Sequence, residues 1–364
     1  MPKPKGLAGG NTVRHMTRLL RSDCSGPGIA RRGRGRGFEY LDEDGDRVTD
    51  PEDLERIRAL GIPPAWRDVW ICPSPRGHLQ ATGTDAAGRK QYRYHDAWRT
   101  RRDAEKFVEM ERFARALPAL RDRVDEDLQG DELTRTRVLA CSVRLLDRGF
   151  FRIGSEEYTE SFGLATMRKQ HVTVAREGEM VFDYPAKSGV RRVQAVVDPD
   201  VAEIVSTLKR RRGGSDELLA FKDGRRWRDL RSEDINAYLK EATGDDFSAK
   251  NFRTWNATVL AAVALSVSGQ VAGTKTGRKR AITRAIKEVA HYLGNTPAVC
   301  RASYIDPRVF DAYRAGLVIG RPLREAADTD EPGELPIHQR ALEEAVLDLI
   351  DERDRSAAIE RVAA

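Results

Sequence analysis

Residues 294–304 hold the side chains of this 364-residue sequence that are best placed to do chemistry. Gly294 is typical of the position just after a helix, and Thr296-Pro297 is typical of the cap and first residue of the next one. Arg301 and Tyr304 then share a helical face, because they lie three residues apart. A tyrosine hydroxyl can act as a nucleophile in covalent catalysis. A lone tyrosine in a helix is, however, more often a core residue.

Three basic residues elsewhere could serve such a nucleophile. Arg152 lies in Phe150-Phe-Arg-Ile-Gly154, Arg253 lies in Lys250-Asn-Phe-Arg-Thr-Trp255, and Lys187 lies in a turn between two expected strands. A guanidinium is always charged, and its planar donors fit two oxygens of one phosphate. Taken singly, the two arginines also fit surface ion pairs, and the lysine fits a solubilising turn residue.

Together with Asn295-Thr-Pro-Ala-Val-Cys-Arg-Ala-Ser-Tyr304, these blocks resemble, in the same order, the active-site segments of poxvirus-type and bacterial type IB DNA topoisomerases. The resemblance covers roughly residues 37–320. It implies that Tyr304 attacks a phosphodiester and forms a 3′-phosphotyrosine, while Arg152 and Arg253 stabilise the five-coordinate transition state. It also implies that Lys187 is the general acid that protonates the departing 5′ oxygen. Resealing then needs no ATP, because the covalent bond stores the energy.

Two positions depart from the poxvirus pattern. Asn295 stands where those enzymes carry a histidine, and its amide is expected to donate a neutral hydrogen bond to the same oxygen, as in some bacterial members. Helix capping is the alternative interpretation of Asn295. Tyr158 matches a tyrosine that the viral enzymes use for DNA contact, but Ser155 replaces their lysine. A strict viral-type site preference is therefore not expected.

Residues 81–94 resemble the segment with which the family contacts the major groove and the DNA backbone. A period of two places Tyr92 and Tyr94 on one strand face, where they could touch phosphate or a thymine methyl group, and Gln91 could read an adenine edge. The alternative is a half-buried hairpin with both tyrosines in the core. The predicted DNA-binding residues are Arg89, Lys90, Gln91, Tyr92, Tyr94 and Tyr158.

The surrounding pattern predicts an α+β protein. Short strands and turns with one helix at Asp50-Pro51 indicate a small β-rich N-terminal lobe over residues 37–98. Apolar residues at helical spacing predict a mainly α-helical domain over residues 99–323. The resemblance implies that this is a catalytic domain of the type IB topoisomerase and tyrosine recombinase class. Alternation between residues 171 and 197 adds a three-stranded β-meander. By resemblance, the two lobes are expected to close around the duplex.

The two ends of the chain carry opposite net charges. Residues 1–36 hold nine Lys and Arg against one acid, and their Gly, Pro and Ser content predicts a disordered basic arm, either a non-specific nucleic-acid binder or a solvated tail. Residues 324–364 hold five Arg against twelve acids and predict an acidic tail with one helix, 341–350. Residues 273–279 indicate a flexible basic loop near DNA.

No cofactor is expected. The four cysteines show no metal-binding spacing, no Walker A motif is present, and no paired carboxylate cluster appears, so neither ATP nor an essential divalent metal is predicted. The longest apolar run falls short of the ~20 residues of a membrane span. The expected partner is double-stranded DNA, with no membrane or small-molecule substrate, and the expected state is a monomer in the cytoplasm, associated with the nucleoid.

The sequence thus predicts an ATP-independent type IB topoisomerase that relaxes supercoiled DNA. A tyrosine site-specific recombinase is the alternative enzyme, since it shares the nucleophile, the two arginines and the hairpin lysine. Its second arginine usually follows H-x-x-R, whereas this chain has Lys250-x-x-Arg253 and a β-rich N-terminal half. A non-catalytic DNA-architectural protein is the alternative of another class and would need none of these residues.

Overall fold

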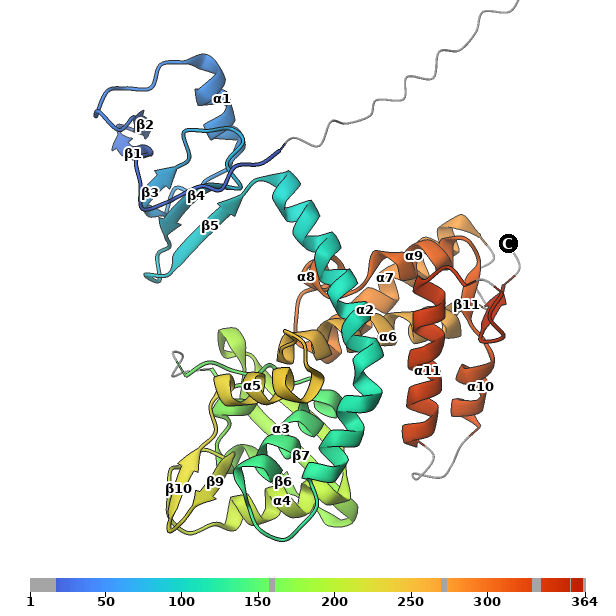
Figure 1. The fold of residues 1–364 in the computed structure, drawn as a ribbon. Coiled ribbons are helices and arrows are strands. Elements are labelled where there is room, and N and C mark those ends of the chain that lie inside the picture. The colour runs from blue at the N-terminus through green and yellow to red at the C-terminus, as the bar shows by residue number, and fades with distance from the viewer. Residues whose placement is uncertain (1–17, 157–160, 270–273, 329–334, 354, 363–364) are drawn as a thin grey trace, which may run out of the picture. The chain divides into compact units, whose positions relative to one another are not determined.

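The computed structural model describes residues 18–156, 161–269, 274–328, 335–353 and 355–362. The chain separates into two units, Met1–Lys106 and Phe107–Ala364 (Figure 1), and each is described by itself. The predicted division at residues 36, 98 and 323 stays a prediction. The first half of the predicted basic arm, residues 1–17, lies outside the described residues.

The first unit is built on a five-stranded antiparallel sheet in the order β2-β1-β3-β4-β5. Its helix, α1 (Pro51–Ala59), begins where the Asp50 carboxylate accepts a hydrogen bond from the Glu52 amide, as the Asp-Pro pair predicts. A small apolar core lies between α1 and the sheet. The strands are β1 (Ile29–Arg34), β2 (Gly37–Leu41), β3 (Arg67–Ile71), β4 (Leu79–Thr84) and β5 (Lys90–Tyr94).

Strand β1 corrects the prediction of disorder up to residue 36. Ile29 is buried in the small core, and the arginines that follow it find partners on β2. Arg31 lies over the Phe38 ring at 4.2 Å, and Arg32 forms an ion pair with Glu39 at 2.6 Å. Cross-strand pairs of this kind stabilise a strand whose composition alone would leave it unstructured.

The second unit is mainly helical and surrounds one large core. Helix α6 lies inside it, with Phe252 and Trp255 almost fully buried. The predicted three-stranded meander is present, in the order β6-β7-β8. The helices are α2 (Asp96–Asp127, which crosses the unit boundary), α3 (Arg135–Gly149), α4 (Pro199–Arg210), α5 (Ser232–Thr243), α6 (Ala249–Gly269), α7 (Lys275–Leu293), α8 (Pro297–Ser303), α9 (Pro307–Arg314), α10 (Arg321–Ala327) and α11 (Leu335–Ile350).

The strands of this unit form three small antiparallel sheets. They are β6 (Val172–Val174), β7 (Glu179–Pro185), β8 (Arg191–Val197), β9 (Ala220–Asp223), β10 (Arg226–Asp229), β11 (Leu317–Ile319) and β12 (Ile359–Arg361). The β-rich N-terminal region and the mainly helical remainder confirm the predicted fold class. Among the described residues, no helix is long and apolar enough to cross a membrane.

The C-terminal segment is part of the core, which corrects its prediction as an acidic tail with one helix. Val346, Leu349 and Ile350 of α11 are buried, because they form the apolar face of an amphipathic helix. Helices α10 and α11 contact each other (Figure 1), and β12 pairs with β11.

A third correction concerns the basic loop predicted over residues 273–279. Residue 273 lies outside the described residues, and Lys275–Lys279 form the first turns of α7. The Thr274 hydroxyl accepts a hydrogen bond from the Gly277 amide at 3.0 Å and so caps the helix.

Candidate active site

The junction between α7 and α8 has the local structure that its residues predict. Gly294 ends α7 in the left-handed conformation, with φ of 60°, and Thr296 caps α8 by accepting from the Val299 amide at 3.3 Å. A Cβ atom at position 294 would lie 2.3 Å from Arg192 Nη1. Glycine is therefore required at this position by its backbone conformation and by the packing of Arg192.

Tyr304 is the residue that follows α8. Its amide donates to the Cys300 carbonyl at 3.0 Å, and its own carbonyl accepts from the Thr258 hydroxyl of α6 at 3.4 Å. The same hydroxyl accepts from the Asp306 amide at 3.1 Å. Helix α6 thus fixes the backbone at and just after the tyrosine, while the half-buried Tyr304 ring packs against the core.

Arg253 is held inside the second unit next to Tyr304. It is 4% exposed and donates to the carbonyls of Phe150 at 2.5 Å and Leu293 at 2.8 Å. Phe150 ends α3 with φ of 53°, a left-handed conformation that is uncommon for a non-glycine residue. The Arg253 guanidinium carbon lies 5.4 Å from the centre of the Tyr304 ring. Among the described residues no carboxylate pairs with Arg253, so the surface ion-pair interpretation is wrong.

Arg152 completes a pair of guanidiniums and is bonded to the α7–α8 junction. One of its nitrogens donates to the Gly294 carbonyl at 3.3 Å and to the Asn295 side-chain oxygen. The Asn295 nitrogen is buried without a conventional hydrogen-bond acceptor, although the Cys300 thiol, a weak acceptor, interacts with the side chain. Asn295 therefore does not cap α8, and its amide group has a donor to spare.

The electrostatics of the cluster favour an ionised phenol. Burial alone would raise the pKa of Tyr304, but the charges of Arg253, Arg152 and Lys250 outweigh it, and the pKa lies below the ordinary value of 10. Burial, together with the charge of Arg152, lowers the pKa of Arg253 to about 10. The cations therefore make the phenol of Tyr304 easier to ionise than a free phenol.

Lys187 is carried by the hairpin between β7 and β8. It is exposed in the turn Lys187–Gly189 between β7 and β8, which the Ala186 and Val190 backbones close with a 2.9 Å hydrogen bond. Among the described residues it forms no hydrogen bond or cation–ring contact with Arg152, Arg253 or Tyr304. The structure thus brings together four of the five predicted catalytic residues, and the role of Lys187 stays a prediction.

Arg192 is a further cation of the site that the sequence analysis missed. From β8 it donates to the Gln194 side chain at 2.7 Å and to the Tyr292 carbonyl, and Gln194 donates to the Gly149 carbonyl. The hairpin that carries Lys187 is thereby tied to the ends of α3 and α7. The sequence feature that could have indicated Arg192 is the alternation of β8. Its inward face carries Arg192 and Gln194, while Val193 is 57% exposed.

In the first unit, β5 presents its tyrosines to solvent. Tyr92 and Tyr94 are 46% and 41% exposed, and their rings stack at 6.1 Å, so the interpretation as core tyrosines is wrong. The Lys90 ammonium lies 6.0 Å from the Tyr92 ring centre. Gln91 lies on the opposite strand face.

The Gln91 amide donates to Asp85 at 2.9 Å, and Arg89 bonds the same carboxylate oxygen at 2.9 Å. The structure therefore does not group these two side chains with the exposed tyrosines. Tyr158 lies outside the described residues.

Comparison with known proteins finds two families that match consecutive parts of the chain. Residues 37–85 match the N-terminal domain of bacterial DNA topoisomerase IB, and residues 95–328 match the catalytic core of eukaryotic DNA topoisomerase I. DNA topoisomerase 1B of Acanthamoeba polyphaga mimivirus is 30% identical over 297 residues, which cover 79% of this chain and 88% of the relative. DNA topoisomerase 1 of Schizosaccharomyces pombe is 30% identical over 149 residues, 38% of this chain and 17% of that protein.

Proposed function

Because this chain belongs to the type IB DNA topoisomerases, as the resemblance of its motifs implied, we propose that it relaxes supercoiled duplex DNA by cutting and resealing one strand with Tyr304. The observation that carries the proposal is that Arg253 lies over the Tyr304 ring, while Arg152, whose charge also acts on the phenol, is bonded to Asn295. The family acts on DNA, and the proposal adds the mechanism and the residues.

In the cutting step the Tyr304 oxygen attacks the phosphorus, a 3′-phosphotyrosine bond forms, and the bond to the 5′ oxygen breaks. The phenol loses its proton on attack, which the lowered pKa of Tyr304 favours. The departing 5′ oxygen takes up a proton from Lys187. Religation is the reverse reaction, in which the 5′ hydroxyl attacks the phosphotyrosine.

The neighbouring side chains supply the charge that this reaction needs. Arg152 and Arg253 face the negative charge that develops on the non-bridging oxygens, and preorganised donors of this kind are the largest contribution in many enzymes. Asn295 offers its spare amide donor to one of these oxygens. Since the energy of the cut bond is kept in the phosphotyrosine, ATP is not required. Because Arg152 and Arg253 meet the developing charge, a divalent metal is not essential.

Relaxation of a negatively supercoiled plasmid in EDTA and without ATP tests this function. The full chain and a Tyr304→Phe variant are run on the same gel after deproteinisation. Relaxation by the wild type alone is the expected result. If neither protein changes the linking number, or if both do, the proposed chemistry at Tyr304 is wrong.

We also propose that the protein works as a monomer on chromosomal DNA in the cytoplasm. The monomer is what the family resemblance implies, and Tyr304, Arg152, Arg253 and Asn295 lie together within a single copy, so the proposed chemistry needs no residue from a second copy. Sedimentation of the protein with and without a short duplex tests it, and a dimer in either state would contradict it.

A further inference from the structure

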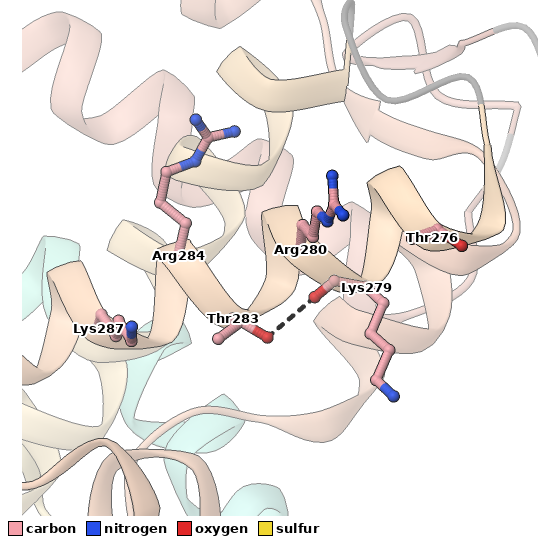
Figure 2. A pocket seen from close by; sticks show the side chains of 6 residues that line it. All are labelled: Thr276, Lys279, Arg280, Thr283, Arg284 and Lys287. Atoms are coloured by element: carbon pink, nitrogen blue, oxygen red, sulfur yellow. Dashed lines mark hydrogen bonds between the residues drawn. The ribbon is translucent and has the colours of Figure 1, made fainter.

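The outward side of α7 carries a row of cations that the proposed cleavage chemistry does not use. Figure 2 shows six side chains that line a shallow hollow of about 470 Å³ along this helix. Their spacing places them opposite the buried residues Ala281, Ile282, Ala285 and Ile286. We call this set the α7 stripe: Thr276, Lys279, Arg280, Thr283, Arg284 and Lys287.

The cations of the α7 stripe are not neutralised by the protein. Residues 275–293 hold six Lys and Arg and one acid, Glu288, whereas the whole 364-residue chain has a net charge of only +6. Among the described residues, none of the four stripe cations forms an ion pair with a carboxylate. Exposed arginines on other helices do so with a carboxylate four residues away, as at Arg123, Arg321 and Arg340.

A solvated helix face is the simpler interpretation, but such faces usually mix charges of both signs, because Glu and Lys four residues apart stabilise a helix. Like charges at this spacing, here Arg280 and Arg284, destabilise it. In Figure 2 these two arginines project to one side of α7 and Lys279 projects to the other. The stripe therefore offers a broad cationic strip, and the matching partner is a regular polyanion.

Position within the fold links the stripe to the cleavage site. Eleven residues separate Thr276 from Lys287, about 17 Å of helix at 1.5 Å per residue, which matches about five base pairs of duplex. The helix then ends at Leu293, whose carbonyl holds Arg253, and at Gly294, whose carbonyl holds Arg152. The row of cations thus leads along one rigid element to the residues around Tyr304.

We propose that the α7 stripe binds the phosphate backbone of the same duplex that is cut at Tyr304, beyond the scissile phosphate. This inference rests on the proposed function, since it places the catalytic duplex over Tyr304. The contacts are electrostatic and independent of base sequence, because the stripe cations lie on a single helix face and the backbone charge is the same at every step.

The salt dependence of DNA binding tests the inference. The full chain carries Tyr304→Phe to prevent cleavage, and its Kd for a fluorescent duplex that extends well past the cleavage position on both sides is measured over a series of salt concentrations. In the variant Lys279→Gln, Arg280→Gln, Arg284→Gln, the slope of log Kd against log salt is expected to fall by about 0.9 for each lost phosphate contact, about 3 in all.

A matched control distinguishes the effect of the α7 stripe from the effect of losing three positive charges anywhere on the protein. The variant Arg123→Gln, Arg321→Gln, Arg340→Gln also removes three positive charges, from exposed residues that already face carboxylates. Its slope is expected to equal that of the parent. An equal fall in both variants, or no fall in the stripe variant, overturns the inference.

Two further outcomes are informative. If the stripe variant keeps its slope for the first duplex, the inference is overturned. The stripe then binds another DNA segment if the covalent complex of the wild type captures a second duplex and the covalent complex of the three stripe substitutions, with Tyr304 restored, does not. If the stripe behaves as expected but the wild type fails to relax plasmid DNA, the proposed function fails while the DNA-binding surface stands.

Discussion

The phenol of Tyr304 is surrounded by cations of different kinds, and the exposed one allows a clean test. Lys250 lies one turn before Arg253 on α6 and helps to lower the pKa of Tyr304. Lys250→Gln should therefore raise that pKa, so that the rise of the single-turnover cleavage rate with pH shifts to higher pH. Lys240→Gln, on α5 beside Asp246, is the control. A profile that moves in neither variant, or equally in both, would count against this electrostatic role.

At Arg253 the geometry of the guanidinium matters as much as its charge. Two nitrogens are fixed by the carbonyls of Phe150 and Leu293, which hold the planar guanidinium in one orientation, and a lysine ammonium has no such planar fork. Arg253→Lys should slow single-turnover cleavage by about 100- to 1,000-fold, the usual effect of losing one preorganised donor. Arg135→Lys, an exposed arginine paired with Asp234, is the control and should cleave normally. A variant as fast as that control would show that charge alone suffices.

At the scale of elements, the β7–β8 hairpin connects the general acid to the rest of the site. Lys187→Ala should cut ordinary DNA slowly and should be rescued by a 5′-bridging phosphorothiolate, whose leaving group needs no proton. Arg192→Ala should show the same pattern in weaker form, because Arg192 holds the hairpin that positions Lys187. Arg191 comes directly before Arg192, lies on the opposite face of β8 and pairs with Asp183, so Arg191→Ala is the control. Equal losses of Arg192→Ala on both substrates would indicate a structural role only.

Local rules predicted the α7–α8 junction because its signals, Gly294 and Thr296-Pro297, act within a few residues of each other. They could not predict Arg192, whose acceptor at Tyr292 lies 100 residues away in sequence. The alternation of β8 was visible in the sequence, with polar Arg192 and Gln194 on one face and Val193 on the other. That the polar face is the buried one can be understood only when the carbonyl groups that Arg192 and Gln194 bond are known. The fold class followed from periodicity, whereas the site depended on contacts between distant elements.

The same limit appears at the scale of the whole second unit, where an acidic composition suggested a tail. Glu343 is 7% exposed on α11 and forms an ion pair with Arg121 of α2 at 2.7 Å. Arg121 also pairs with Asp147 of α3 at 2.8 Å. One arginine thus joins three helices from distant parts of the sequence, and charge counting along the chain could not show that an acid of the segment is buried.

Removal of this arginine tests whether the C-terminal segment supports the core that positions the catalytic residues. Arg121→Met leaves Asp147 and Glu343 buried without their cation and should lower the free energy of unfolding by about 3 to 5 kcal/mol, the usual cost of breaking a buried ion pair from one side. Adding Asp147→Asn and Glu343→Gln removes the uncompensated charges, so the triple variant should recover part of the loss in urea unfolding. If the triple variant were less stable than Arg121→Met, the carboxylates would be stabilising by other means. The segment would then not depend on the three-helix ion pair for its place in the core.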